Sequence, residues 1–237
     1  MTTATQGGVA LAALWRLLSL GFSSPTEETA AEVEVLAEGL AEAEARPEVE
    51  RVLGALRESE LDELSTQFAR LFRGNVLVPP YEGSYEIDPI RQGRQMADAA
   101  AFYRAFGAEA GGPSVERPDF VGCELEFLSF LELRHLVALE NDEEESSLVG
   151  EIGDTFLVDH AGRWLPTFFA DVEREAVEAP FYRELAALGA RVVADELSRR
   201  GLEPSPLPRR RTRSSVERDS FECGEASPAR PEPGIDL

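Results

Sequence analysis

Apolar residues recur in this chain with the spacing of an α-helix along most of its length, and almost no segment alternates like a half-buried β-strand. One stripe runs through Leu11, Leu14, Trp15, Leu18 and Phe22, in steps that keep all five on one helix face. Proline, glycine and serine interrupt the pattern, and the helical segments that we predict are 29–43, 49–56, 59–72, 88–106, 117–140, a segment that restarts at Ser147, an element around 164–169, and 181–197. The spacing therefore predicts an all-α bundle of roughly nine helices without a sheet.

Several positions carry signals for helix ends. Ser24, which precedes a proline, can cap one helix, and Ser59 can open another. Asp88, also followed by proline, is expected to start a helix that Gly107 stops.

The longest predicted helix, 117–140, is apolar on more than one side, so we expect it near the centre of the bundle. The acidic run 140–145 that follows reads as a solvated connector. We expect residues 1–203 to form one helical domain. Residues 204–237 are rich in proline, arginine and serine without periodicity, which predicts a disordered tail.

The charge of the chain limits its partners. It has 23 basic and 45 acidic residues, a net charge of −22, and every basic residue is arginine. Such a surface repels nucleic acids and anionic membranes and attracts a cationic partner. An alternative cause is adaptation of a whole proteome to high salt, with lysine lost to GC-rich coding, and the two causes are compatible.

Cysteines and apolar runs point to the cytoplasm. Cys123 and Cys223 do not make a disulfide framework, which favours a reducing compartment. No run approaches the roughly 18 apolar residues that a membrane span needs. The apolar segment 9–22 is short, contains Arg16 and follows no basic residue, so it does not resemble a secretory signal. We expect no stable membrane insertion.

A stiff apolar loop follows the helix that ends near Phe72. Phe68, Leu71 and Phe72 fall on one helix face, and Gly74 can leave the helix with a positive φ. Two prolines then exclude a helix interior or a central strand, and the loop continues through Tyr81, Glu82, Ser84 and Tyr85. Two readings are open: the aromatic stripe packs in the core, or part of it lines a groove floored by the loop.

Three blocks of sequence resemble one family. F-x-x-L-F-x-G and P-P-Y-E-x-S-Y, between Phe68 and Tyr85, are similar to the signature of the TorD/DmsD/NarJ chaperones, which help mature molybdenum-containing oxidoreductases. The block 116–131, ERPDFVGCELEFLSFL, resembles the second motif of that family. A weaker resemblance to the family follows in 159–168 and 180–188. The resemblance covers roughly residues 11–197 and implies a cytoplasmic chaperone without cofactor or catalysis.

The resemblance also implies a client: the apo-form of a molybdopterin-dependent oxidoreductase, its twin-arginine signal peptide, or both. Such a peptide carries paired arginines and an apolar segment that can form a helix, which suits an apolar groove with carboxylates. The peptide-binding residues that we predict on this basis are Phe68, Leu71, Phe72, Pro79, Pro80, Tyr81, Glu82, Ser84, Tyr85, Asp119, Phe120 and Glu124. For Asp119, the alternative is a role in the first turn of a helix.

The sequence departs from the family pattern at two positions. The family often places histidine after the acidic residue that corresponds to Asp119, but here Phe120 follows it. It also often has glutamate four residues before the first aromatic residue of the signature, where this chain has Leu64. The resemblance therefore does not identify the client.

Sequence signals for other chemistry are weak. Glu132 and His135 form one E-x-x-H half-motif of a di-iron bundle, and His160 lacks the matching glutamate, so we predict no metal site. No phosphate-binding loop with lysine and no nucleophile–base set is present in the sequence.

Alternatives to the chaperone are a non-catalytic subunit of a membrane-bound reductase complex and a carboxylate-based hydrolase. The chain is expected to be a monomer or a helix-swapped dimer. The basic run 208–215 is expected to be solvated, or to fold back onto the acidic body.

Overall fold

A computed structural model describes the chain except residues 1–2, 44–45, 108–115, 142 and 208–237. Its nine described α-helices are α1 (Thr3–Gly21), α2 (Glu27–Ala43), α3 (Pro47–Arg57), α4 (Leu61–Phe72), α5 (Pro89–Ala105), α6 (Val121–Asn141), α7 (Glu143–Phe156), α8 (Gly162–Glu175) and α9 (Pro180–Arg200). A 3₁₀ turn, η1 (Glu82–Ser84), precedes α5, and a π-helical turn, η2 (Leu157–Ala161), joins α7 to α8 without a break. The described part thus has eight continuous helical rods and no strand, which confirms the all-α prediction.

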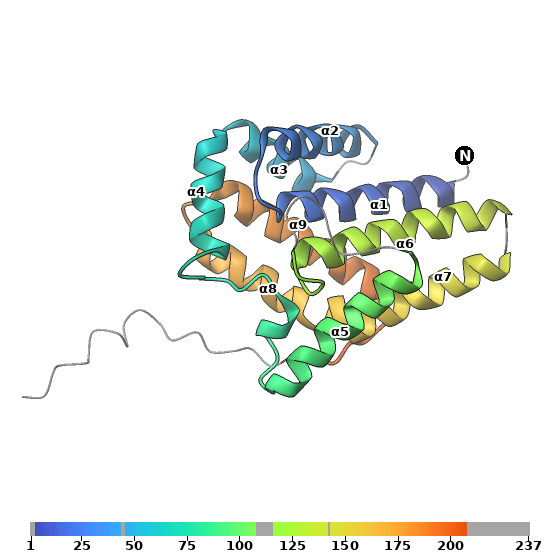
Figure 1. Cartoon of the computed structure of the whole chain (residues 1–237). Helices are drawn as coiled ribbons and strands as arrows, with labels where there is room; N and C mark the ends of the chain where they lie inside the picture. Colours follow the sequence, from blue (N-terminus) through green and yellow to red (C-terminus); the bar gives the residue numbers. More distant parts are fainter. Residues whose placement is uncertain (1–2, 44–45, 108–115, 142, 208–237) are drawn as a thin grey trace, which may run out of the picture.

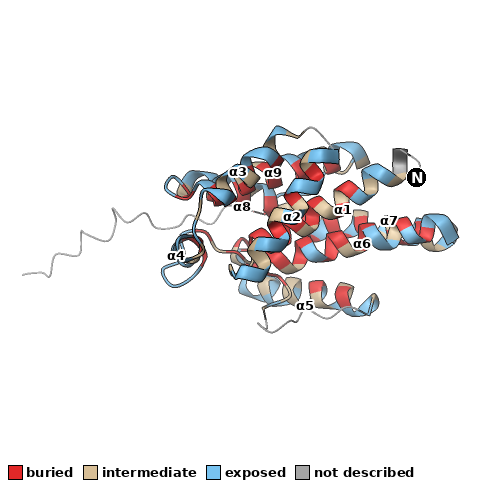
Figure 2. Ribbon diagram, turned by 90° about the horizontal axis from the view of Figure 1, so that it is seen from above, coloured by how far each residue is buried: buried red, intermediate tan, exposed pale blue. Residues whose placement is uncertain are grey.

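The helices pack as a bundle in which α1 and α9 contact each other (Figure 1). Helix α1 packs along α6 and α2, while α9 packs along α8 and α3, and α7 covers a further side of α6. The buried residues of α6 lie on several of its sides, as expected for a central helix (Figure 2). Among the described residues, no helix combines the length and the apolar character that crossing a membrane requires.

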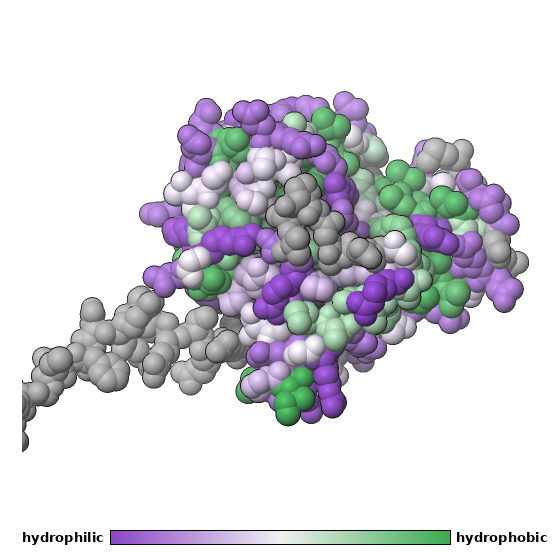
Figure 3. All heavy atoms as spheres, viewed as in Figure 1, coloured by the Kyte–Doolittle hydropathy of each residue, from purple (hydrophilic) through white to green (hydrophobic). Residues whose placement is uncertain are grey.

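The outer half of α6 is less covered than its first half. Leu133 and Val137 are 50% and 64% exposed, and Leu148 on α7 is also exposed. In the space-filling view, hydrophobic side chains gather over this end of α6 and α7 among hydrophilic ones (Figure 3). The bundle therefore ends in a partly apolar surface on the side away from α4.

Two predicted helix ends are confirmed and two are wrong. The Asp88 side chain accepts a hydrogen bond from the backbone N–H of Ile90 at 2.9 Å and caps α5, and the chain leaves that helix with a φ of 68° at Gly107. Ser24 does not cap α2, which begins at Glu27, because Thr26 accepts the hydrogen bond from the N–H of Thr29 at 3.1 Å. Ser59 does not cap α4, because its hydroxyl donates back to the carbonyl of Ala55 in α3.

The predicted acidic connector is mostly helical. Helix α6 continues to Asn141 and α7 begins at Glu143, so only residue 142, outside the described residues, separates them. The start of the predicted tail is also held: Leu207 is buried, and its N–H donates to the carbonyl of Arg163 at 2.9 Å. The rest of that tail, 208–237, lies outside the described residues.

Candidate functional site

The loop after α4 is fixed by backbone hydrogen bonds to two parts of the chain. The N–H groups of Leu77 and Val78 both donate to the carbonyl of Leu71, at 3.1 and 3.0 Å, which satisfies an acceptor at the end of α4. Gly74, with a φ of 61°, makes the turn between Leu71 and Leu77, as the sequence predicts. Further on, the carbonyl of Pro80 accepts from the N–H of Val121, the first residue of α6, at 2.9 Å. The loop is therefore attached to α4 and α6.

Asp119 ties this loop to the segment before α6. Its carboxylate is fully buried and accepts from both Nε and Nη2 of Arg117, at 2.9 and 2.7 Å, and from the N–H of Gly83, at 3.1 Å. Its backbone carbonyl accepts from the N–H of Glu82 at 2.9 Å. A Cβ on Gly83 would lie 3.0 Å from the carboxylate, so glycine allows this close approach. Asp119 thus acts as an anchor of the loop.

Aromatic and charged groups cover the outer side of this anchor. Tyr81 pairs with Phe120 in an antiparallel bridge, and their ring centroids are 5.7 Å apart. The guanidinium of Arg117 lies 4.7 Å from the centroid of the Tyr81 ring. The Tyr81 hydroxyl donates to Glu116 at 3.2 Å, and Glu116 also accepts from Arg73. The two sequence motifs therefore meet in one folded unit.

Two glutamates lie buried beneath the loop, each with an aromatic partner from the middle of the α7–η2–α8 rod. The Nδ1 of His160, in η2, lies 3.0 Å from Oε2 of Glu82. The indole N–H of Trp164, in α8, donates to Oε2 of Glu124 at 2.8 Å. Oε1 of each glutamate has no hydrogen-bond partner among the described residues. Although Phe120 takes the usual place of histidine, a buried imidazole is thus supplied from another helix.

The electrostatic environment of Glu124 favours its neutral form. Burial raises the pKa of Glu124 well above its usual 4.5, and repulsion from Glu82 and Asp119 acts in the same direction. The hydrogen bond from Trp164 lowers this pKa and only partly opposes the shift. Glu124 therefore provides no exposed negative charge for a cationic partner.

The aromatic stripe of α4 packs in the core, so the expected open groove over it is absent from the described structure. Phe68, Leu71 and Phe72 are all buried. The Phe72 ring lies 5.6 Å from that of Tyr182 and 6.1 Å from that of Phe168, in α9 and α8. This correction has a simple cause: α8 and α9 cover the apolar face of α4.

Of the twelve predicted peptide-binding residues, nine are buried and three reach the surface in part: Pro79, Tyr81 and Ser84. The buried members include Pro80, Glu82, Tyr85, Phe120 and Glu124. The structure brings most of the twelve together inside the fold, in a unit that joins the loop after α4 to the start of α6. We call this buried unit the internal clamp. Their role in peptide binding stays a prediction.

Two hollows of similar size lie elsewhere on the described surface. One, of about 620 Å³, adjoins the clamp and is mostly charged, with lining residues Glu86, Arg91, Arg94, Gln95, Ala97, Asp98, Asp159, His160 and Arg163. The other, of about 640 Å³, lies between α1, α6, α7 and α9. None of the predicted peptide-binding residues lines the second hollow. Its walls come from four separate helices, so no single sequence motif marks it.

The two side chains of the E-x-x-H half-motif contact different groups. Glu132 accepts from Arg200 at 3.2 Å, whereas Nδ1 of His135 lies 3.0 Å from the carbonyl of Ser146. No group of three histidine, cysteine or acidic side chains in the described ranges is arranged to hold a metal ion.

Comparison with known proteins assigns the chain to a family. The family model described as nitrate reductase delta subunit matches residues 26–170, and the chain belongs to this family. The match agrees with the resemblance to the TorD/DmsD/NarJ chaperones.

Two curated relatives and one solved structure are similar to this chain. The chlorate reductase assembly chaperone protein of Ideonella dechloratans is 30% identical over 146 residues, covering 60% of this chain and 73% of the relative. The selenate reductase assembly chaperone protein of Thauera selenatis is 31% identical over 121 residues, covering 51% and 61%. The crystal structure of a putative redox enzyme maturation protein from Archaeoglobus fulgidus has a TM-score of 0.53 and 22% identity, covering 77% of this chain and 93% of that one. At this identity, the solved structure supports the fold alone.

Proposed function

We propose that this chain is an assembly chaperone for the catalytic subunit of a molybdopterin-dependent reductase, of the dimethyl sulfoxide reductase or nitrate reductase type. The observation that carries the proposal is that two relatives, for chlorate and selenate reductase, are both named as assembly chaperones. The signature residues of the family are mostly buried here and build an internal clamp. Together with the names of the two relatives, this supports a chain that acts by binding, without turnover of its own.

The proposed client form is the cofactor-free catalytic subunit, its twin-arginine signal peptide, or both, held in the cytoplasm until the cofactor is inserted before export or assembly. A net charge of −22 without lysine supports a cationic partner segment. Each guanidinium of an arginine pair can bind a carboxylate through two parallel hydrogen bonds, which the ammonium group of lysine cannot do. An apolar segment next to them can bind as a helix.

The test is co-expression with the catalytic subunit of a reductase of this class, followed by separation of its cofactor-free and cofactor-loaded forms. The chain should co-purify with the cofactor-free form and be absent from the loaded enzyme. Failure to bind either form would contradict the proposal.

A second candidate is a permanent non-catalytic subunit of a reductase complex, which the family description as a delta subunit favours. The same experiment separates the two functions. A permanent subunit would remain with the loaded enzyme at a fixed ratio, whereas a chaperone would leave it.

A further inference from the structure

Helix α5 lies at the edge of the bundle and buries little of itself. Of the 17 residues of this helix, all of them described, only Ala99 and Tyr103 are buried. The element that it packs against most is the short turn η1 rather than another long helix. Its ribbon is accordingly mostly intermediate or exposed (Figure 2). A few side chains therefore attach α5 to the rest of the fold.

Two aromatic side chains make the apolar part of this attachment. The Phe102 ring packs edge-on against that of Phe156, with centroids 5.4 Å apart. The Tyr103 ring lies 4.8 Å from that of Phe127, and its hydroxyl donates to the carbonyl of Pro118 at 2.7 Å. Phe127 and Phe156 are 4% and 0% exposed. Helix α5 thus covers an aromatic surface that α6 and α7 supply.

A third attachment is charged and joins Asp98 of α5 to the buried imidazole of His160. Nε2 of His160 lies 3.6 Å from Oδ2 of Asp98, and Nε2 has no hydrogen-bond partner among the described residues. The two side chains are 1% and 67% exposed, respectively. At this distance the contact is electrostatic, so its sign depends on whether Nε2 carries a proton.

Glu82 and His160 together decide which form Nε2 takes. The contact of 3.0 Å between Nδ1 and Oε2 of Glu82 keeps one proton between these two atoms. A second proton on the pair places an N–H on Nε2, which attracts the Asp98 carboxylate. Without that proton, Nε2 presents a lone pair to the carboxylate and repels it. Such a pair titrates as one unit, and imidazole ordinarily changes charge between about pH 5 and 8.

The other groups around the imidazole carry charges that cancel. The hollow of about 620 Å³ that His160 lines has as many basic as acidic side chains: Arg91, Arg94, Arg163, Glu86, Asp98 and Asp159. Helix α7 contributes the Phe156 ring, which stacks on the imidazole at 5.1 Å. Helix α6 contributes Glu124, whose pKa is raised by burial and by repulsion from Glu82, so that its neutral form is favoured. The proton on the Glu82–His160 pair is therefore the charge that varies.

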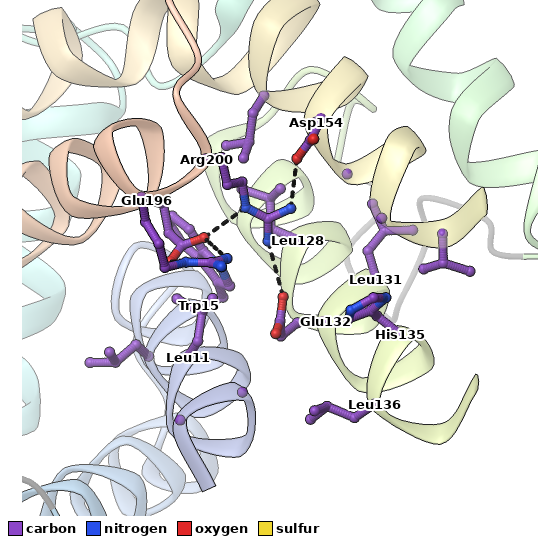
Figure 4. A pocket seen from close by; sticks show the side chains of 18 of the residues that line it. Leu11, Trp15, Leu128, Leu131, Glu132, His135, Leu136, Asp154, Glu196 and Arg200 are labelled. Carbon is purple, nitrogen blue, oxygen red and sulfur yellow. Dashed lines mark hydrogen bonds and ion pairs between the residues drawn. The ribbon is translucent and has the colours of Figure 1, made fainter. Parts of the chain in front are cut away.

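The hollow between α1, α6, α7 and α9 shows how a permanent ionic attachment differs (Figure 4). There Arg200 donates to Glu132 of α6 at 3.2 Å and to Glu196 of α9 at 2.8 Å. It also donates to Asp154 of α7 at 2.8 Å. A guanidinium stays charged across the physiological range of pH. Helix α7 is thus held at every such pH, whereas Asp98 faces a group that can lose its charge.

We propose that α5 is a lid that a proton on the Glu82–His160 pair holds closed. At low pH the imidazolium attracts Asp98, and α5 stays on the aromatic surface. At higher pH the attraction becomes repulsion, and α5 opens more often and uncovers the rings of Phe127 and Phe156. The inference goes beyond the proposed function and does not depend on it.

The test is hydrogen–deuterium exchange of the full chain at pH 5.5 and pH 8, read by mass spectrometry. Labelling times are scaled to the intrinsic exchange rate at each pH. Peptides from α5 report the lid, and peptides from α6 report the bundle. Asp98→Asn removes the charge of an exposed side chain and should fold. Asp195→Asn is the matched control, because Asp195 is also exposed and lies in α9.

We expect scaled exchange in α5 to be about threefold faster at pH 8 than at pH 5.5, the size of effect that one partly exposed ion pair gives. Asp195→Asn should keep this difference, and Asp98→Asn should remove most of it while α6 exchanges as in the wild type. The lid is overturned by the absence of a difference in the wild type or by an equal difference in Asp98→Asn. It is also overturned if Asp98→Asn changes α6 as much as α5, because the effect is then global.

Discussion

The imidazole of His160 and the carboxylate of Glu82 form a buried pair that joins two turns distant in the sequence. Their Nδ1 and Oε2 atoms are 3.0 Å apart, and the two side chains are 1% and 0% exposed. Glu82 begins the 3₁₀ turn of the proline loop, and His160 lies in the π turn between α7 and α8. The pair therefore attaches the loop to the α7–α8 rod.

Removing the imidazole should destabilise the fold strongly. His160→Phe leaves the Glu82 carboxyl group buried without its hydrogen-bond partner, which costs about 1–3 kcal/mol. Urea unfolding of His160→Phe, Glu82→Gln and the double variant measures the coupling. The double variant should recover part of the loss. Additive losses would show that the two side chains do not interact.

Asp119 should contribute more to stability than an exposed acidic residue. Asp119→Ala removes the acceptor of the Gly83 N–H and of two Arg117 hydrogen bonds, and we expect a loss of about 3 kcal/mol. Asp195→Ala, which removes a surface pair with Arg191, should cost about 0.5 kcal/mol and is the control. Equal losses in denaturant unfolding would contradict the anchoring role.

Phe72 should act on stability rather than directly on the client. Phe72→Ala removes a ring in contact with Tyr182 and Phe168 and should cost about 3–5 kcal/mol. Where the variant is still folded, its affinity for the twin-arginine peptide should be close to that of the wild type. A stable variant with lost binding would instead support the reading of the α4 stripe as a groove.

Glu124 should make stability depend on pH. Because its pKa is raised in the folded state, folded protein binds the proton more tightly than unfolded protein. Its contribution to stability is therefore fully present below the unfolded pKa of about 4.5 and falls as pH rises toward the raised folded value. Glu124→Gln stays neutral, so the loss of stability with rising pH should be smaller than in the wild type.

The measurement for Glu124 is the urea midpoint of both proteins between pH 4.5 and neutral pH. Glu124→Gln should be at least as stable as the wild type at neutral pH. A variant that is less stable there, and only there, would mean that Glu124 works as an anion.

The fold could be predicted because its signals are local. Helical periodicity needs only neighbours three and four residues apart, and Asp88 and Gly107 mark helix ends by their own backbone chemistry. Ser24 and Ser59 misled the prediction because another residue nearby made the capping contact or none was made. The acidic run beginning at Glu140 looked like a connector, yet the helices on both sides continue into it.

The site could be predicted only in part, because its contacts join distant segments. An amphipathic stripe such as that of Phe68 shows which face of α4 is apolar, but not that α8 and α9 cover that face. The His160–Glu82 pair spans 78 residues, and the three carboxylates that accept hydrogen bonds from Arg200 come from three helices. Neither leaves a spacing that sequence reasoning can detect.

The central claim, that the chain matures a molybdopterin-dependent reductase, is tested most directly by the molybdenum content of that reductase. The enzyme would be purified from cells with and without this chain and analysed for molybdenum per catalytic subunit. The account predicts nearly complete loading with the chain and mostly cofactor-free enzyme without it. Equal molybdenum content in both preparations would contradict it.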